Sequence, residues 1–359
     1  MRNNFIKAAS AVLLLASVMA FHCSCSEDET TRVEYKGTFY LGVNLKDATC
    51  IYKSGELLCV LEPNSQIRGI AVMPDGCIYA CGEILDIPVN GGNALTPVPA
   101  IWKDGKRLDL DLGASGSMTG MVASGNSWIC CGTLKGDDGE YGVIIEDGKV
   151  VYRSESNISF KCMDRGASGD CYVVTDGNGK LSLQRISAED WELKTVDVIA
   201  ADGSEGDWIP NCIHVGNTDI AVGLTKFNRT TFESDAYFWL DDGRGIERIG
   251  NSSVASDITF YNGWIVVGGY KATVKKTPQY LTVDTKAVQW INGEGQDFSY
   301  DCIGNSEVAL LKSWNNMFLF QCVTHEGGIQ ICNNGSMIEE ISFDEKPSVT
   351  CWDVRVRAI

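Results

Sequence analysis

The sequence predicts an all-β fold, a β-propeller of seven blades, with six and eight blades as alternatives. Two repeated patterns and a match between the two chain ends lead to this prediction. The propeller is expected over residues 36–359, after a signal segment at 1–24 and a flexible acidic tether at 25–35. Composition agrees, because 44% of the 359 residues are hydrophobic and 21% are charged, as in ordinary globular proteins.

The first pattern is a short apolar block typical of a β-strand. It recurs seven times at spacings of 39 to 50 residues, the period of a blade with four short strands. The blocks are 39–44, 78–83, 128–133, 171–176, 220–225, 265–270 and 308–313. Hairpin turns are predicted after several of these blocks, because Asp-Gly or Asn-Gly stands at 104–105, 147–148 and 334–335. Glycine accepts the positive φ that such turns need.

The second pattern precedes each block and predicts the innermost strand of each blade. It consists of a polar residue, then usually glycine or cysteine, then usually a larger apolar residue. Small residues suit this strand because it is crowded against its neighbours around the axis. The polar members are expected to form a ring: Arg68, Thr119, Lys161, Asn211, Asp257, Asp301 and Thr350.

The chain ends predict how the ring closes. The chain begins with the second strand of a blade and ends, around 349–354, with an innermost strand. One C-terminal and three N-terminal strands would then complete a blade, which protects strand edges. The pattern is weakest over 306–328, where 308–313 and 317–323 both read as strands and one of them is expected to be an insertion.

The N-terminus has the features of a secretory signal. Arg2 and Lys7 precede an apolar run at 8–21 that is too short to span a membrane. Ser24-Cys25-Ser26, followed at once by three acidic residues, resembles the signal of bacterial lipoproteins, with Cys25 as the lipidated residue. His22 departs from the usual leucine there, and an ordinary cleaved signal with a free Cys25 stays open as the alternative.

The acidic residues after Cys25 are similar to those of Bacteroidota lipoproteins, and the repeat resembles the propellers of exported Bacteroidota lipoproteins of unassigned function. The resemblance implies an outer-membrane lipoprotein, at the cell surface or facing the periplasm, that touches the membrane only through its lipid. It implies no catalytic residue. The net charge of −17, more negative still without Arg2 and Lys7, argues against nucleic acid as a partner because it repels phosphate.

Metal and redox chemistry have little support in the sequence. Fifteen cysteines occur without a CxxC motif, and many lie in apolar strand patterns where cysteine behaves as a small hydrophobe. Cys162 and Cys171 flank a turn, and both a disulfide and free thiols are open for them. After the signal only His214 and His325 remain, too few for a histidine metal cluster. No cofactor is expected; the acidic loops 137–140 and 202–207 are conceivable Ca²⁺ sites, with solvated loops as the alternative.

The predicted ring and one tryptophan supply the candidate binding residues. Ligands are expected where the axis meets the loops that enter the innermost strands, so the candidates are Arg68, Lys161, Asn211, Asp257 and Asp301. Trp208, beside Asp207, is added because an exposed tryptophan among polar groups can stack on sugars or hold peptides. The alternative for the ring is mutual pairing with one another and with channel water.

Two function classes are compatible with these features. The first is a non-catalytic envelope-anchored binding or scaffold protein that presents a propeller face to a glycan, a peptide or an envelope protein. The second is a carboxylate-based glycoside hydrolase or polysaccharide lyase, which requires two carboxyl groups about 5–10 Å apart on one face. The absence of a nucleophile motif and the scarcity of histidine favour the first.

Overall fold

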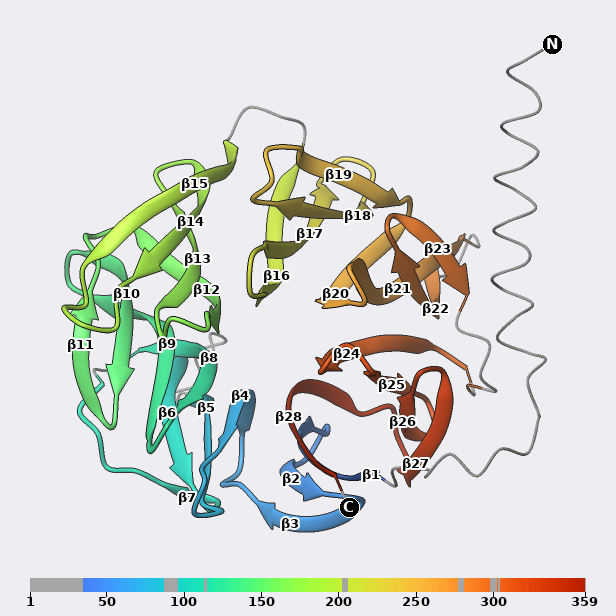
Figure 1. Cartoon of the computed structure of the whole chain (residues 1–359), viewed down its shortest axis with the longest axis horizontal. Coiled ribbons are helices and arrows are strands. Elements are labelled where there is room, and N and C mark those ends of the chain that lie inside the picture. Colours follow the sequence, from blue (N-terminus) through green and yellow to red (C-terminus); the bar gives the residue numbers. More distant parts are fainter. Residues whose placement is uncertain are drawn as a thin grey trace. The chain divides into compact units, whose positions relative to one another are not determined.

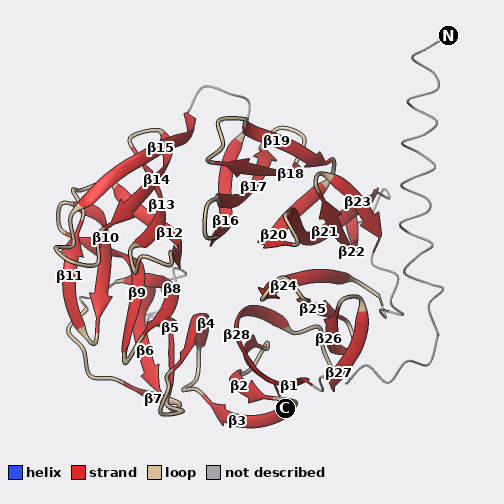
Figure 2. Ribbon diagram, viewed as in Figure 1, coloured by secondary structure: helices blue, strands red, loops and turns tan. Residues whose placement is uncertain are grey.

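The computed structural model describes residues 35–86, 96–112, 115–201, 206–276, 281–297, 302 and 304–358. These residues form strands, turns and loops, as Figure 2 shows. No helix in these ranges is long and apolar enough to cross a membrane. The compact unit Gly37–Arg355 contains nearly all of the strands and the two cavities described below.

Five sheets of this unit have four strands each, ordered from the innermost to the outermost strand. The blade formed by both ends of the unit has β28 (Ser348–Ala358), β1 (Tyr35–Asn44), β2 (Thr49–Lys53) and β3 (Glu56–Val60). The next has β4 (Ser65–Val72), β5 (Ile78–Asp86), β6 (Thr96–Lys103) and β7 (Lys106–Arg107). Figure 1 shows β28 and β4 side by side near the centre.

The other three four-stranded sheets come from the second half of the chain. They are β16 (Asp207–Val215), β17 (Ile220–Asn228), β18 (Glu233–Leu240) and β19 (Gly245–Gly250); β20 (Ser253–Tyr261), β21 (Trp264–Lys276), β22 (Leu281–Ile291) and β23 (Glu294–Asp297); and β24 (Ser306–Trp314), β25 (Phe318–His325), β26 (Gly328–Asn333) and β27 (Ser336–Ser342). Within each sheet, neighbouring strands are antiparallel.

The remaining sheet has eight strands. Its first half contains β8 (Gly116–Ser124), β9 (Ser127–Gly136), β10 (Gly139–Glu146) and β11 (Lys149–Arg153), and its second half β12 (Ile158–Arg165), β13 (Cys171–Gly177), β14 (Lys180–Ile186) and β15 (Leu193–Ala201). The two halves join where Tyr141 of β10 pairs with Ile158 of β12, in parallel. All-β propeller architecture is therefore confirmed.

The prediction of seven blades is wrong, as are its alternatives of six and eight. The described part of the chain forms five separate four-stranded blades and one continuous eight-stranded sheet. The cause is the turn after β11, which folds back on the start of β10. Ser154 Oγ accepts the N–H of Gly142 at 2.8 Å, and the N–H of Asn157 donates to the carbonyl of Glu140 at 2.6 Å.

The predicted closure by the two chain ends is confirmed by the pairing of β28 with β1. Polar contacts also join β28 to β4, because Thr350 Oγ1 donates to the carbonyl of Ile67 at 2.5 Å and Asp353 Oδ2 accepts the N–H of Val72 at 3.1 Å. On the other side, Phe39 of β1 packs edge-on against Phe320 of β25 at 5.5 Å. The end-formed blade is thus held from both neighbouring sheets.

The hydrophobic core lies between neighbouring sheets. One cluster joins Ile51 of β2 to Ile70 of β4, and another joins Phe238 of β18 to Ile258 of β20. Each buried aliphatic or aromatic side chain of this size stabilises the fold by about 2 kcal/mol. The core is therefore distributed around the unit, and each sheet depends on the next for its burial.

The innermost strands β4, β8, β12, β16, β20 and β24 each carry a β-bulge in their first half. One residue is skipped in the pairing with the second strand in each case: Arg68, Thr119, Lys161, Asn211, Ser256 and Ala309. A bulge turns the skipped side chain out of the regular alternation. The partner strand must come close there: a Cβ on Gly82 or Gly269 would lie 1.9 Å from the carbonyl oxygen of Gln66 or Val254.

Two strand predictions near the C-terminal part are wrong. Residues 308–313 do not form a second strand; they belong to β24, the innermost strand, and β25 is the second strand. Neither is an insertion. Apolar alternation is the same in both strand types, and only the skip at Ala309 marks β24 as innermost.

Candidate functional site

Two cavities within the unit Gly37–Arg355 lie around the innermost strands. The larger, about 690 Å³, is named here the bulge-end cavity because the skipped residues line it. Its lining contains Arg68, Ser117, Thr119, Lys161, Asn211, Val254, Ala255, Ser256, Tyr270, Glu307, Ala309, Leu310, Thr324 and the segment from Lys346 to Thr350. Both Lys346 and Pro347 lie in the loop that enters β28, where the ligand site was expected.

Three cations line the bulge-end cavity. The Arg68 guanidinium is held on one side by Glu83 at 2.9 Å and by Gln66 Oε1 at 3.0 Å, yet its side chain is 43% exposed. Lys161 Nζ lies 3.4 Å from an oxygen of the half-exposed Asp176. Lys346 is exposed and has no ion pair within the described part of the chain.

One carboxylate, Glu307, lines this cavity among the described residues, and the hydroxyl of Ser256 donates to it. Tyr270 lies beside it; burial first and the charge of Glu307 second raise the pKa of its phenol. The phenol therefore stays protonated at neutral pH and can donate a hydrogen bond. Cationic and hydroxyl donors around one carboxylate suit a ligand that brings its own negative charge.

The neutral members of the ring serve mainly to join neighbouring strands. Thr119 Oγ1 donates to the carbonyl of Phe160 at 3.1 Å, and Thr350 makes the equivalent contact with Ile67. Asn211 donates both of its N–H groups, to Thr225 at 2.8 Å and to the carbonyl of Ala255 at 2.6 Å. The partners in these contacts lie outside the ring, so the expected alternative, that ring members pair with one another and with channel water, stays a prediction.

Asp257 lies one residue beyond the bulge and does not line the bulge-end cavity. Its Oδ2 accepts the N–H of Leu311 at 2.7 Å, and its Oδ1 accepts the N–H of Ile258 at 2.8 Å. Burial raises the pKa of Asp257 to about 7, against the lowering effect of these two N–H donors. The skipped residue of this strand is Ser256.

The other candidates are placed elsewhere. Asp301 and Cys25 lie outside the described residues. Asp207 pairs with Arg229 at the start of β16. Trp208 is half-buried: Tyr237 packs edge-on against it at 5.0 Å, and Lys226 Nζ lies 5.3 Å from its ring centre. Neither Asp207 nor Trp208 lines the two cavities. A binding role for any of these residues stays a prediction.

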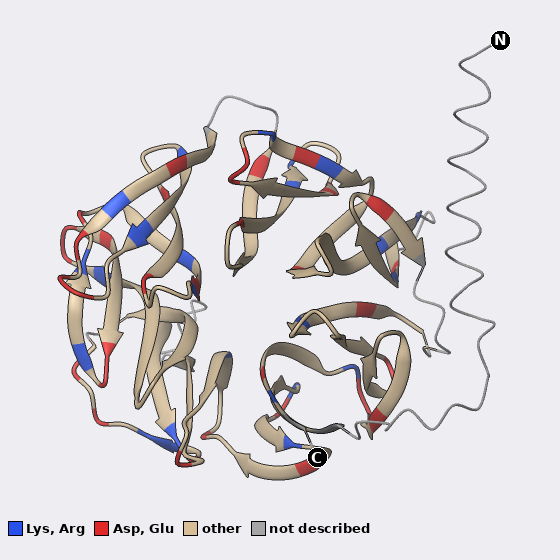
Figure 3. Cartoon of the chain, in the orientation of Figure 1, with Lys and Arg blue, Asp and Glu red and all other residues tan. Residues whose placement is uncertain are grey.

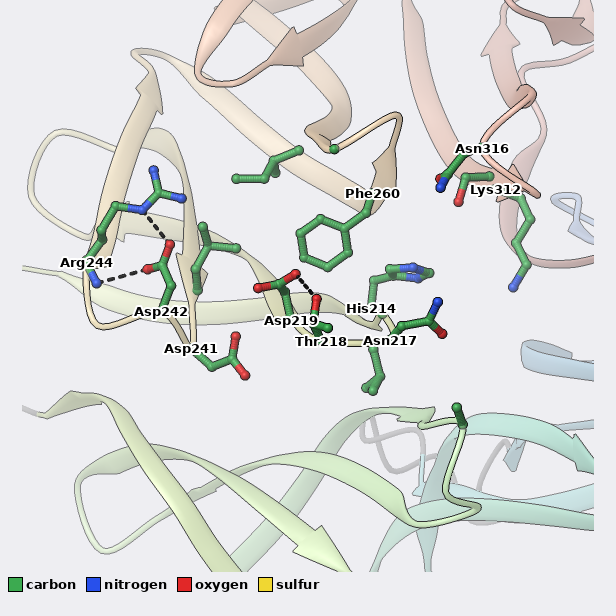
Figure 4. Close-up of a pocket in the computed structure, with 17 residues that line it drawn as sticks. His214, Asn217, Thr218, Asp219, Asp241, Asp242, Arg244, Phe260, Lys312 and Asn316 are labelled. Carbon is green, nitrogen blue, oxygen red and sulfur yellow. Dashed lines mark hydrogen bonds and ion pairs between the residues drawn. The ribbon is translucent and has the colours of Figure 1, made fainter.

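The second cavity, about 500 Å³, is named here the His214 cavity and is shown in Figure 4. It lies toward the far ends of the innermost strands, three residues beyond the bulge in β16 and in β24. Its lining contains Ala167, His214, Val215, Gly216, Asn217, Thr218, Asp219, Leu240, Asp241, Asp242, Arg244, Phe260, Gly263, Ile265, Lys312, Ser313 and Asn316. It shares no lining residue with the bulge-end cavity.

His214 stands at the inner side of its cavity. Its Nδ1 lies 3.6 Å from Asp164 Oδ2, and its ring centre lies 5.7 Å from that of Phe260. Burial lowers the pKa of His214, and this outweighs the raising effect of Asp164. His214 is therefore a neutral imidazole at neutral pH. The neighbouring Asp164 Oδ2 accepts a hydrogen bond from the N–H of Val215 at 2.8 Å.

His325, Cys162 and Cys171 line neither of the two cavities. His325 is 2% exposed in β25, its Nδ1 accepts the N–H of Gly327, and burial lowers its pKa. The disulfide alternative for Cys162 and Cys171 is wrong. In the register of β12 and β13, Cys162 lies opposite Val174 and Cys171 lies opposite Arg165, so the two cysteines do not face each other. Both thiols are free and buried.

Metal binding stays untested. Within the described ranges, no group of three or more His, Cys, Asp or Glu side chains is placed to hold a metal ion. Of the two conceivable Ca²⁺ loops, 137–140 is the turn between β9 and β10, and most of 202–207 lies outside these ranges. Figure 3 marks both acidic and basic residues on outer strands such as β15 and β19.

Comparison with known proteins assigns no family to the chain. No family model matches the chain, and no curated protein does. Similar solved structures include a protein from Lactobacillus plantarum, at 10% identity and a TM-score of 0.49 over 90% of this chain and 100% of the other. A dihydro-heme d1 dehydrogenase is similar at 10% identity and a TM-score of 0.48, over 91% and 77%. The β-propeller domain of the Trilobed protease from Pyrococcus furiosus has 11% identity and a TM-score of 0.40, over 77% and 84%.

These structures include an enzyme and a protein without a stated activity, so the likeness carries no function.

Proposed function

We propose that this protein is a non-catalytic binding or scaffold protein of the outer membrane, anchored by a lipid on Cys25. Its bulge-end cavity takes a carboxylate group of a short glycan or peptide. This ligand is either a free molecule or a part of an envelope protein. The supporting observation is the lining of that cavity, which among the described residues contains three cations and one carboxylate, on a protein of net charge −17. Because the rest of the charge is negative, long polyanions, nucleic acid included, are repelled.

The enzyme alternative gains no support from the cavity. A carboxylate-based hydrolase or lyase needs two carboxyl groups within reach of one sugar ring. The described lining of the bulge-end cavity contains Glu307 as its acid, and that side chain already accepts the hydroxyl of Ser256. Glu83 is 5% exposed and pairs with Arg68. Binding without turnover is therefore the function that these contacts support best.

Calorimetry with matched ligands tests the cavity. Short oligomers of glucuronate and galacturonate are compared with the neutral glucose and galactose oligomers, and peptides with a free C-terminus with amidated ones. We expect the acidic ligands of one set, either the uronate oligomers or the peptides with a free C-terminus, to bind. Salt should weaken this binding because the attraction is electrostatic. Equal affinity for acidic and neutral partners would contradict the proposal.

Variants assign the binding to the cavity. Lys161→Met with Lys346→Met removes two charges at similar side-chain volume and is expected to weaken binding about tenfold. Arg68 is kept, because its loss leaves Glu83 buried without a counter-ion. Lys180→Met, at the exposed start of β14 and outside both cavities, is the matched control and should bind as the wild type.

The anchor has its own test, independent of the cavity. Cys25→Ser should move the full chain from the membrane to the soluble fraction of a bacterial host. Cys23→Ser is the matched control, since it removes a thiol two residues away. Identical membrane association of both variants would show that Cys25 carries no lipid.

A further inference from the structure

We propose that the His214 cavity is a second ligand site and that it takes a neutral sugar. The inference goes beyond the proposed function, because it concerns the other set of lining residues and an uncharged ligand. A cavity of about 500 Å³ is within the range of small-molecule sites and is large enough for one or two sugar rings. Its wall combines an aromatic ring with polar groups from several hairpins (Figure 4).

Four hairpins and one further turn build the wall. Ala167, Asn217, Gly263 and Asn316 come from the turns between the first and second strands of four successive strand groups, and Asp241 comes from the β18–β19 turn. Hydrogen bonds within the turns fix their shapes. The N–H of Gly216 donates to the carbonyl of Asp219 at 2.8 Å. A site assembled in advance loses less entropy on binding.

Phe260 provides the apolar surface of the site. Its ring is half-buried, with His214 on one side and Gly216 on another. Gly216 leaves the space for it, since a Cβ there would lie 3.1 Å from Phe260 Cδ2. The rest of the ring lines the cavity, beside Ile265 and Leu240. The C–H face of a sugar can pack on such a ring.

Charges within the cavity largely cancel. Asp242 pairs with the Arg244 side chain at 2.6 Å. The pKa of Asp242 is lowered mainly by the hydrogen bond from the backbone N–H of Arg244, and further by this side-chain contact. Lys312 lines the cavity together with Asp219 and Asp241, and His214 is neutral because burial lowers its pKa. No strong net charge of either sign is therefore presented to a ligand, in contrast to the three cations of the bulge-end cavity.

Hydrogen-bonding groups of both kinds remain available. Asp241 uses Oδ1 to accept the N–H of Ile220 at 2.8 Å, and Asp219 uses Oδ2 to accept the hydroxyl of Thr218 at 2.5 Å, so each keeps its other oxygen. Asn217, Asn316 and Lys312 are exposed, and their side chains make no hydrogen bond or ion pair within the described part of the chain. Sugar hydroxyls both donate and accept, and this mixture matches them.

The test uses the full chain and neutral sugars: glucose, galactose, mannose, maltose and cellobiose. Ligand-observed NMR detects binding, and the fluorescence of Trp264, 51% exposed and next to the cavity-lining Gly263, gives a second readout. We expect saturable binding of at least one sugar, and a fluorescence change that Trp264→Phe removes. Lack of saturable binding of all five sugars would overturn the proposal.

Two variants locate the binding. Phe260→Leu keeps an apolar side chain but loses the aromatic ring, and Asn217→Ala with Asp219→Ala removes exposed polar groups without touching the core. Each is expected to weaken sugar binding about tenfold or more. Asp75→Ala, in the corresponding turn of the β4 blade, is the matched control and should leave binding unchanged. Sugar binding that survives both cavity variants would place it elsewhere and refute the assignment.

The outcome is separable from that of the proposed function. Lys161→Met with Lys346→Met should leave sugar binding intact, because those residues line the other cavity. Conversely, Phe260→Leu should leave the binding of acidic ligands intact. Loss of both activities in one folded variant would contradict the existence of two independent sites.

Discussion

Asp257 makes the stability of the protein depend on pH in a defined direction. Burial raises its pKa from the ordinary value of 3.8 to about 7 in the folded state. At 1.36 kcal/mol per pKa unit, the ionised carboxylate costs the folded state about 4 kcal/mol. The folded protein holds this proton more tightly than the unfolded chain, so the free energy of unfolding falls as pH rises from about 4 to about 7 and is constant above that.

Asp257→Asn removes the titration and keeps the size of the side chain. The amide can accept from only one of the two N–H groups, of Leu311 and Ile258, that the carboxylate satisfies, which costs about 1–2 kcal/mol at every pH. Above pH 7 this loss is smaller than the ionisation cost of about 4 kcal/mol that the variant avoids. The variant should therefore be about 2 kcal/mol more stable than the wild type at pH 8, and less stable at pH 4.5.

Urea denaturation of both proteins between pH 4.5 and 8.5 measures this difference. Other titrating groups, His214 among them, contribute to both curves and largely cancel when the two are subtracted. Asp353→Ala removes the same kind of contact between innermost strands elsewhere in the ring, together with an ion pair to Arg355, and measures what such contacts contribute. A difference between the wild type and Asp257→Asn that is constant across this range would refute the reasoning.

The packing supports three further predictions. Asp353→Ala leaves a backbone N–H of β4 without its acceptor and should lower the free energy of unfolding by about 2–3 kcal/mol, measured by urea denaturation; an unchanged midpoint contradicts the role of β28 in closing the ring. Gly269→Ala places a Cβ 1.9 Å from the carbonyl of Val254 and should cost about 3 kcal/mol, seen as a lower melting temperature. Cys130 and Cys131 are fully buried, and burial raises the pKa of both thiols, so mass spectrometry should find them unalkylated by iodoacetamide until urea is added.

The bulge explains how much of the ring could be predicted from sequence. At Arg68, Thr119, Lys161 and Asn211 the predicted polar position is the skipped residue. The sequence reveals it there because a polar residue interrupts an otherwise apolar strand. In β20 two polar residues are adjacent, and the prediction names Asp257 where the skip falls on Ser256. Sequence polarity alone does not tell which of two neighbours leaves the pairing.

The β24 strand shows why the last position was missed. Its skipped residue is Ala309, so the polar signal is absent. The sequence pattern therefore points to Asp301, outside the described residues, and places 308–313 one strand too far out. A glycine opposite the bulge marks other blades, as Gly82 and Gly269 do, but the corresponding position in β25 is Val323.

The sheet count and the site chemistry depend on contacts that sequence spacing does not contain. The junction of Tyr141 with Ile158 arises from the conformation of a four-residue turn, which the repeat period cannot show. Likewise Lys346 reaches the bulge-end cavity from a loop, and Phe260 reaches the His214 cavity from the end of a strand. Neither residue stands out in the sequence, because its role comes only from the neighbours that the fold supplies.

The level just beyond the bulges separates the two cavities. The residues there are Gly69, Gly120, Cys162, Cys212, Asp257 and Leu310 in the six bulged strands, and in β28 Cys351 follows the polar ring member Thr350. The three thiols are at most 9% exposed, and burial raises the pKa of each, so this level is occupied by small, uncharged groups and one carboxyl that is half protonated near pH 7. The two linings share no residue and differ in charge character, and they are therefore expected to give two separate specificities.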